Sequence, residues 1–298
     1  MFCSIIVPTY NRPDQLDRCL GALNAQQGVE FEVVVVDDGS AVAMEPICLR
    51  HGPRIRYMRQ ENSGPAQARN AGARAARGEF LVFTDDDCLP RPDWILRLRE
   101  AHGGKPERMV GGLVVNGLPK DRFASASQAL CDFLYDYFRA TEGKMPFFTS
   151  NNIAMSSEAF HRLGGFDATF ETAAAEDRDL GIRWRELGGE LFFCPDAVVD
   201  HFHHMTLRRF WRQHANYGTG ARHLHHVMRV RKVAQPRFEP LSFYGRLVTW
   251  PIRQQGLRGA KLAVLMVISQ IAMVAGYLRA YRNRPRNVTE TITDQPGQ

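Results

Sequence analysis

Residues 79–88 read EFLVFTDDDC and join a short apolar run to three consecutive acids. The run Phe80–Phe83 is rich in strand-forming residues, which predicts a buried β-strand. Asp85, Asp86 and Asp87 follow it at once, and carboxylates packed together repel one another unless a cation lies between them. Mg²⁺ and Mn²⁺ take oxygen ligands and are often shared between carboxylates and substrate phosphates. These acids are therefore either a solvated turn or part of a metal–phosphate site.

Polar clusters also follow two earlier apolar runs. Phe2–Val7 leads into PTYN, and Phe31–Val36 leads into DDGS. Helical patterns from about Pro13 and between residues 63 and 78 separate the runs, and strand–helix alternation is typical of a parallel α/β sheet. Ligands bind such sheets beyond the carboxyl ends of the strands, so the three clusters should meet at one edge. No GxGxxG follows any of these strands, so a dinucleotide-binding site is not indicated.

The second half of the chain is less regular and offers two further polar positions. Asn151 and Asn152 form an amide pair that could hold sugar hydroxyls or serve as core and turn amides. Glu176 and Asp177 begin a helix, where acids are stabilised by the helix dipole. An acid at the mouth of a sheet is also suited to act as a general base, provided that it reaches the acceptor hydroxyl.

Composition limits the class of protein. The chain has 298 residues and a net charge of +6, enough for one large domain or a domain with an appendage. The basic excess lies largely in the C-terminal half, so a basic nucleic-acid-binding module is one alternative. Six cysteines are scattered without CxxC pairs, which indicates a reducing compartment. The N-terminal apolar run lacks the features of a secretory signal, so we expect a cytoplasmic catalytic part.

Five motifs in order resemble those of family-2 glycosyltransferases. They are SIIVPTYNR, VVVVDDGS, GPAQARNAGARAARGEFLVFTDDDC, GGFDATF and AEDRDLGIRWRELGG, and they extend from Ser4 to about Gly189. The resemblance implies an α/β fold of the GT-A type: a Rossmann-like, mostly parallel sheet flanked by helices, with a helical C-terminal appendage. It also implies a nucleotide-sugar donor, most often a UDP-sugar, with Mn²⁺ or Mg²⁺ on its diphosphate, and inversion at the anomeric carbon.

The resemblance assigns roles to individual residues. Asp177 corresponds to the catalytic base, and Asp87, Asp85 and His201 to metal ligands. The nucleotide-sugar site would contain Pro8, Thr9, Tyr10, Asp38, Arg69, Asn70, Asp85 and Asp86. Acceptor contacts would come from Asn151, Asn152 and Glu176.

The sequence departs from the processive polysaccharide synthases of this family, because no QxxRW motif follows the EDRDL helix. RRFWRQHANYG occupies that region, which favours transfer of a single sugar. A nucleotidyltransferase is the alternative enzyme, but it needs a glycine-rich basic loop after the first strand, and PTYNRPDQL is not one.

The stretch Leu262–Leu278 is almost continuously apolar and close to the shortest length that crosses a membrane. Basic residues lie on both sides of it, which conflicts with the positive-inside preference for a single span. We therefore expect an interfacial helix at the inner face of the cell membrane and a sugar, lipid-linked or small-molecule acceptor; packing on the catalytic domain or on a second copy is the alternative.

The predicted domains are a catalytic domain over 1–205 and a helical, basic and hydrophobic region over 206–286. Within the first, residues 1–115 would bind the nucleotide sugar and 116–205 the acceptor. Residues 287–298 are expected to be a disordered tail.

Overall fold

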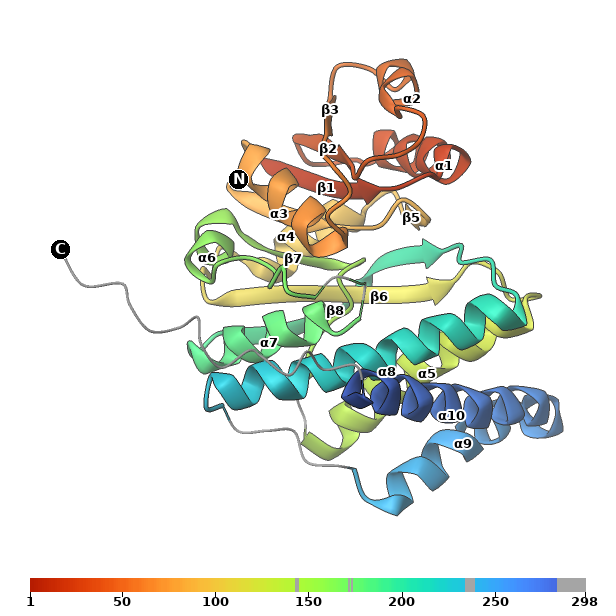
Figure 1. The fold of residues 1–298 in the computed structure, drawn as a ribbon. Helices are drawn as coiled ribbons and strands as arrows, with labels where there is room; N and C mark the ends of the chain where they lie inside the picture. The colour runs from red at the N-terminus through yellow and green to blue at the C-terminus, as the bar shows by residue number, and fades with distance from the viewer. Residues whose placement is uncertain (143–144, 171, 173, 234–238, 283–298) are drawn as a thin grey trace.

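The computed structural model describes residues 1–142, 145–170, 172, 174–233 and 239–282 (Figure 1). The predicted tail at 287–298 lies outside these residues. Within them the backbone forms one eight-stranded sheet of order β3-β2-β1-β4-β7-β6-β8-β5. The strands are β1 Cys3–Thr9, β2 Phe31–Asp37, β3 Ile55–Arg59, β4 Phe80–Phe83, β5 Cys88–Pro90, β6 Arg108–Asn116, β7 Ile153–Ser156 and β8 Glu190–His201.

The predicted parallel arrangement is confirmed for the first four strands. β3, β2, β1 and β4 are mutually parallel, whereas β7 runs antiparallel to both β4 and β6. β8 is parallel to β6, and β5 pairs antiparallel with β8 through the register Cys88 to His201. That last pairing brings the end of the acid triplet beside the end of β8.

Helices cover both faces of the sheet. They are α1 Pro13–Asn24, α2 Glu45–Arg50, α3 Pro65–Ala75, α4 Trp94–His102, α5 Arg122–Glu142, α6 Ser157–Arg162, α7 Glu176–Glu186, α8 Leu207–Val230, α9 Leu241–Gln255 and α10 Ala260–Arg282, with a 3₁₀ turn at Gly256–Gly259. Because side chains alternate along a strand, Ile5 of β1 packs with α1 and α4. Ile6 faces the opposite layer, which contains α3, α6 and α7.

The C-terminal helices are joined to the catalytic part by shared cores. Phe133 of α5 lies in one cluster with Phe243 and Leu247 of α9 and Met266 of α10. In Figure 1, α5, α8, α9 and α10 lie together at the end of the molecule opposite α2 and β3. The region after residue 205 is thus packed against α5 as well as against itself.

α8 and α10 touch through glycines. A Cβ on Gly276 would lie 1.8 Å from the carbonyl oxygen of Ala215, and one on Gly218 would lie 1.9 Å from that of Met273. Such separations are impossible for real atoms, so any larger residue must push the helices apart.

We expect Gly276→Ala to lower the free energy of unfolding by about 1–3 kcal/mol, because the added methyl overfills this contact. Gly245→Ala is the matched control: the same change in α9 meets nothing within 4 Å and should raise helix stability by up to about 1 kcal/mol. Urea denaturation of both variants measures the difference. Equal effects would contradict the close packing of α8 on α10.

Candidate active site

The polar ends of the strands meet as predicted. The hydroxyl of Thr9, the last residue of β1, donates to Asp86 Oδ2 at 2.8 Å. The backbone N–H of Asp38, just after β2, donates to the carbonyl of Thr9 at 2.9 Å. The backbone N–H of Thr84, the residue after β4, donates to the carbonyl of Ile6 in β1 at 3.2 Å. Three segments that are distant in sequence therefore form one edge of the sheet.

Arg12 lies between two acids of the triplet. Its Nη1 is 3.0 Å from Asp86 Oδ1 and 3.0 Å from Asp87 Oδ2. Burial raises the pKa of Asp86 to about 7 against the opposing effect of Arg12. The sequence prediction did not include Arg12, although it ends the PTYNR segment that follows β1. The guanidinium supplies a positive charge to the cluster from the chain itself.

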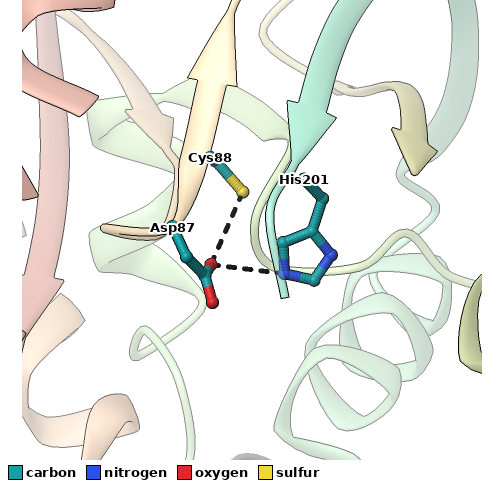
Figure 2. A group of neighbouring side chains, drawn as sticks. All are labelled: Asp87, Cys88 and His201. Atoms are coloured by element: carbon teal, nitrogen blue, oxygen red, sulfur yellow. Dashed lines mark hydrogen bonds and ion pairs between the residues drawn. The ribbon is translucent and has the colours of Figure 1, made fainter. Parts of the chain in front are cut away.

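Asp87 is also paired with His201, from the end of β8. Figure 2 shows the imidazole and carboxylate facing each other, with Nε2 3.2 Å from Oδ1. Burial tends to raise the pKa of Asp87, but His201 and Arg12 outweigh it and keep the pKa below its usual value. Burial tends to lower the pKa of His201, but the negative charge of Asp87 outweighs it, and the pKa is raised.

The donor set fits a hard divalent cation. Asp87, Cys88 and His201 place one ligand atom each within 4.8 Å of one another. Burial raises the pKa of the Cys88 thiol well above its usual value, so the sulfur stays protonated and is a poor ligand. One carboxylate and one imidazole remain, and Mg²⁺ or Mn²⁺ is commonly held by few protein ligands with water and phosphate completing the shell.

Arg69 of α3 joins the triplet to the first turn of α7. Its side chain is 2% exposed, and its Nη2 lies 2.7 Å from Asp85 while Nη1 lies 3.2 Å from Glu176. Glu176 is 3% exposed, and burial together with the neighbouring Asp177 raises its pKa to about 7. Within the described residues, Arg69 is the cation that both acids pair with.

Asp177 lies next to this ion pair and faces the cavity. Its Oδ1 accepts a hydrogen bond from the N–H of Arg178 at 2.7 Å, and burial raises its pKa. Ala175, the residue that precedes α7, has φ of +73°, a left-handed conformation that costs a non-glycine residue of order 1 kcal/mol. The strained turn fixes where the helix, and with it Asp177, begins.

Asp38 and Tyr10 lie at the opposite rim. Asp38 accepts hydrogen bonds from Gln60 and the backbone of Ser63 and Gly64 at 2.7–2.9 Å. A carboxylate has about four acceptor positions, so Asp38 both holds the loop before α3 and retains capacity for a ligand. Tyr10 is 49% exposed, with its ring free to contact one.

Two predicted site amides are hydrogen-bonded within the protein, and for Asn152 this is the core-amide alternative that the sequence left open. Asn152 donates to the carbonyls of Leu113 and Ala197 and accepts from the indole of Trp94. Asn70 exchanges two hydrogen bonds with the backbone of Phe166. Both amides are structural ties, and neither lines the cavity.

Asn151 does line the cavity. Its Nδ2 donates weakly to Cys88 Sγ at 3.7 Å, and its Oδ1 has no hydrogen-bond partner among the described residues. A buried carbonyl oxygen of this kind is available for a ligand hydroxyl.

A single cavity of about 1780 Å³ connects these groups. Its wall includes the following predicted site residues: Pro8, Thr9, Tyr10, Asp38, Arg69, Asp85, Asp86, Asp87, Asn151, Glu176, Asp177 and His201. The arrangement can hold a cation and an anionic ligand at one end and offer a carboxylate base beside them.

Comparison with known proteins gives a consistent result. The model of "Glycosyl transferase family 2" matches residues 4–164. The chain is 33% identical over 212 residues to validoxylamine A glucosyltransferase of Streptomyces hygroscopicus, with 60% of this chain and 50% of that one covered. It is 29% identical over 279 residues to the pre-mycofactocin glycosyltransferase of Mycobacterium tuberculosis, covering 89% and 55%. The chain spans about half the length of these relatives.

Two solved structures share the fold. The mannosyltransferase PcManGT from Pyrobaculum calidifontis, in complex with GDP-Man and Mn²⁺, superposes with a TM-score of 0.67 at 20% identity, covering 95% of this chain and 88% of that one. GalNAc-T7 with UDP, GalNAc and Mn²⁺ gives a TM-score of 0.57 at 16% identity, covering 95% and 56%. At these identities the likeness concerns the fold.

We expect Arg69→Met to lower the free energy of unfolding by about 3–5 kcal/mol, because it leaves Glu176 buried beside Asp177 without its cation. The double variant Arg69→Met with Glu176→Gln should recover part of that loss, since the orphaned charge is gone. Urea denaturation of Arg69→Met, Glu176→Gln and the double variant measures the coupling free energy between the two side chains. Additive losses would show that the two side chains do not stabilise each other.

Proposed function

The chain belongs to glycosyl transferase family 2, and from this premise we propose that it transfers one sugar, with inversion, from a nucleotide sugar to an acceptor hydroxyl. The resemblance found in the sequence and the GT-A type of fold are both confirmed. Family membership also decides between the enzyme alternatives in favour of a glycosyltransferase over a nucleotidyltransferase. The observation that carries the proposal is the placement of Asp87, Arg69 and Asp177 on the wall of one cavity.

The donor would lie at the end of the cavity formed by β1, β2 and β4. Tyr10 is exposed there for stacking on a base, and Asp38 keeps acceptor capacity for a base or ribose group. Asp87, His201 and Asp85 would hold a Mn²⁺ or Mg²⁺ ion, which would neutralise the negative charge that develops on the diphosphate leaving group. The two structures of similar fold contain Mn²⁺ with GDP-Man and with UDP. We propose a UDP-sugar as the donor here.

Asp177 would act as the base. It takes the proton from the acceptor hydroxyl while that oxygen forms a bond to the anomeric carbon, and the bond from this carbon to the nucleoside diphosphate breaks. A single displacement from the face opposite the leaving group inverts the carbon. Arg69 and Glu176 fix the helix that carries Asp177, and Asn151 Oδ1 can accept from a sugar hydroxyl.

The outer face of α10 supports contact with a membrane. Five apolar residues are exposed at a helical spacing of three and four, each between 41% and 60%: Val264, Val267, Ile271, Val274 and Leu278. Arg258 and Lys261 lie before this stripe and Arg279 and Arg282 after it; Arg284 and Arg286 are outside the described residues. By length and composition alone the segment Leu241–Arg282 could cross a membrane, with 33% of its most apolar window buried.

An apolar stripe with basic ends suits the surface of an anionic bilayer better than a span, since both ends favour the same side. We therefore propose a cytoplasmic enzyme that rests on the inner face of the cell membrane through α10.

A nucleotide screen tests the donor assignment. We expect UDP with Mn²⁺ to raise the melting temperature more than GDP, dTDP or CDP, and Asp87→Asn to abolish the metal-dependent part of that shift. If Mn²⁺ increased the UDP-induced shift of Asp87→Asn as much as it does that of the unaltered protein, Asp87 would not belong to the cation site.

Asp177→Asn separates chemistry from donor binding. We expect turnover to fall by about 10²- to 10⁴-fold, because the proton acceptor is lost. The rise in melting temperature with UDP and Mn²⁺ should be the same as in the unaltered protein. The amide is nearly the same size as the carboxylate, so packing is preserved. Near-normal turnover in this variant would refute the assignment of the base.

Flotation with vesicles tests the membrane contact. We expect Ile271→Gln with Val274→Gln to reduce the fraction bound to vesicles that contain anionic lipid, since both side chains are exposed and apolar. Val42→Gln with Leu49→Gln is the control, because these residues are 73% and 74% exposed in the N-terminal half. Equal flotation of all three proteins would argue against contact through α10.

A further inference from the structure

The cavity extends beyond the catalytic acids into the helical end of the molecule. Past Asp177 its wall passes to α5, α8, α9 and α10. Arg139, Gln254 and Gln270 of these helices line the cavity, and the apolar part of the helical wall includes Leu134 and Phe138 of α5, Leu247 and Trp250 of α9, and Met273 of α10. We call this part the helical chamber. It belongs to the same continuous cavity as the cluster of Asp85, Asp86 and Asp87.

The wall of the cavity carries both polar and apolar side chains. Part of it carries hydrogen-bonding side chains, among them Asp132, Gln128 and Tyr217. The Gln128 amide donates to Asp132 at 2.8 Å, so this part is ordered and polar. The five residues that define the helical chamber are uncharged, and four of them are only half-buried. Three of these four, Leu134, Trp250 and Met273, pack against one hydrophobic cluster.

The volume also exceeds what one small ligand needs. Sites for single small molecules are commonly about 300–1,000 Å³, whereas this cavity is about 1780 Å³. The donor would occupy the end near Thr9 and Asp38. The helical chamber is therefore available to a second molecule whose reactive end lies at Asp177.

The two sides of α10 give the direction from which such a molecule would come. Met273 lines the chamber, and the next residue, Val274, belongs to the exposed apolar stripe. Successive residues in a helix are about 100° apart, so the wall of the chamber and the stripe are adjacent faces of one helix. An aliphatic chain leaving a bilayer under the stripe would meet apolar side chains on both faces.

We propose that the helical chamber binds the aliphatic chain of an amphiphilic acceptor, whose hydroxyl end lies at Asp177. This proposal rests on the proposed glycosyl transfer for the identity of the reactive end, but the chamber can be tested by binding alone. It assigns the acceptor to molecules that carry a flexible apolar tail.

The test uses methyl, hexyl, octyl and decyl β-D-glucopyranosides as probes, titrated calorimetrically below their micelle concentrations. Affinity should increase roughly fourfold for each methylene that enters the chamber. Trp250→Gln and Leu134→Gln should each flatten that dependence on chain length, since each places a polar amide in the wall. Either variant suffices if the other does not fold.

Trp211→Gln is the matched control for Trp250→Gln. Trp211 is 42% exposed on α8 and does not line the cavity, so the variant should keep the chain-length dependence. Equal affinity for methyl and decyl glucoside in the unaltered protein, or an unchanged dependence in both chamber variants, would overturn the proposal. If the unaltered protein showed the dependence on alkyl chain length but did not bind UDP with Mn²⁺, the result would count against the proposed function alone.

A second arm identifies the source of the chain. Decyl glucoside is supplied either free or embedded in phosphatidylcholine–phosphatidylglycerol vesicles. If the chain enters from a bilayer, Ile271→Gln with Val274→Gln should weaken binding of the embedded probe and leave that of the free probe unchanged. Equal weakening in both forms would place the stripe residues in the binding of the chain itself and overturn the entry route.

Discussion

The buried guanidinium of Arg69 is the interaction on which the geometry of this site depends. It pairs with Asp85, which follows the central strand β4, and with Glu176, which opens α7 and lies 107 residues after Arg69. A charge buried to this extent is tolerated only where acids satisfy it. Because each partner needs the other, the acid triplet and the helix carrying Asp177 cannot move independently without leaving a buried charge unpaired.

The C-terminal helices extend this organisation away from the sheet. α5 shares its apolar residues with α9 and α10, and α8 and α10 approach each other at glycines. These helices form the walls of the helical chamber. The cluster of acids therefore lies between a polar edge of the sheet and the helices that line the rest of the cavity.

Local sequence patterns predicted much of the fold and part of the site. Near-continuous apolar runs marked β1, β2 and β4, and polar residues at their ends do converge, since parallel strands point their carboxyl ends to one edge. Local patterns do not reveal hydrogen bonds between distant segments. The resemblance to the family assigned Asn70 to the nucleotide site, whereas its amide is bonded to the backbone of Phe166, 96 residues away. Strand β5, which follows the acids, is only three residues long, too short for an alternating apolar pattern to predict it.

Arg12 changes what the acid cluster requires in order to fold. Because its guanidinium already lies across Asp86 and Asp87, the carboxylates are held together by a counter-charge belonging to the chain. We infer that the pocket is assembled before any ion arrives, unlike small metal-dependent domains in which ligand binding and folding are one event. An ion at Asp87 would compete with this tethered side chain, so its retention would depend on the phosphate ligands that accompany it, and it would be free to leave with the spent nucleotide.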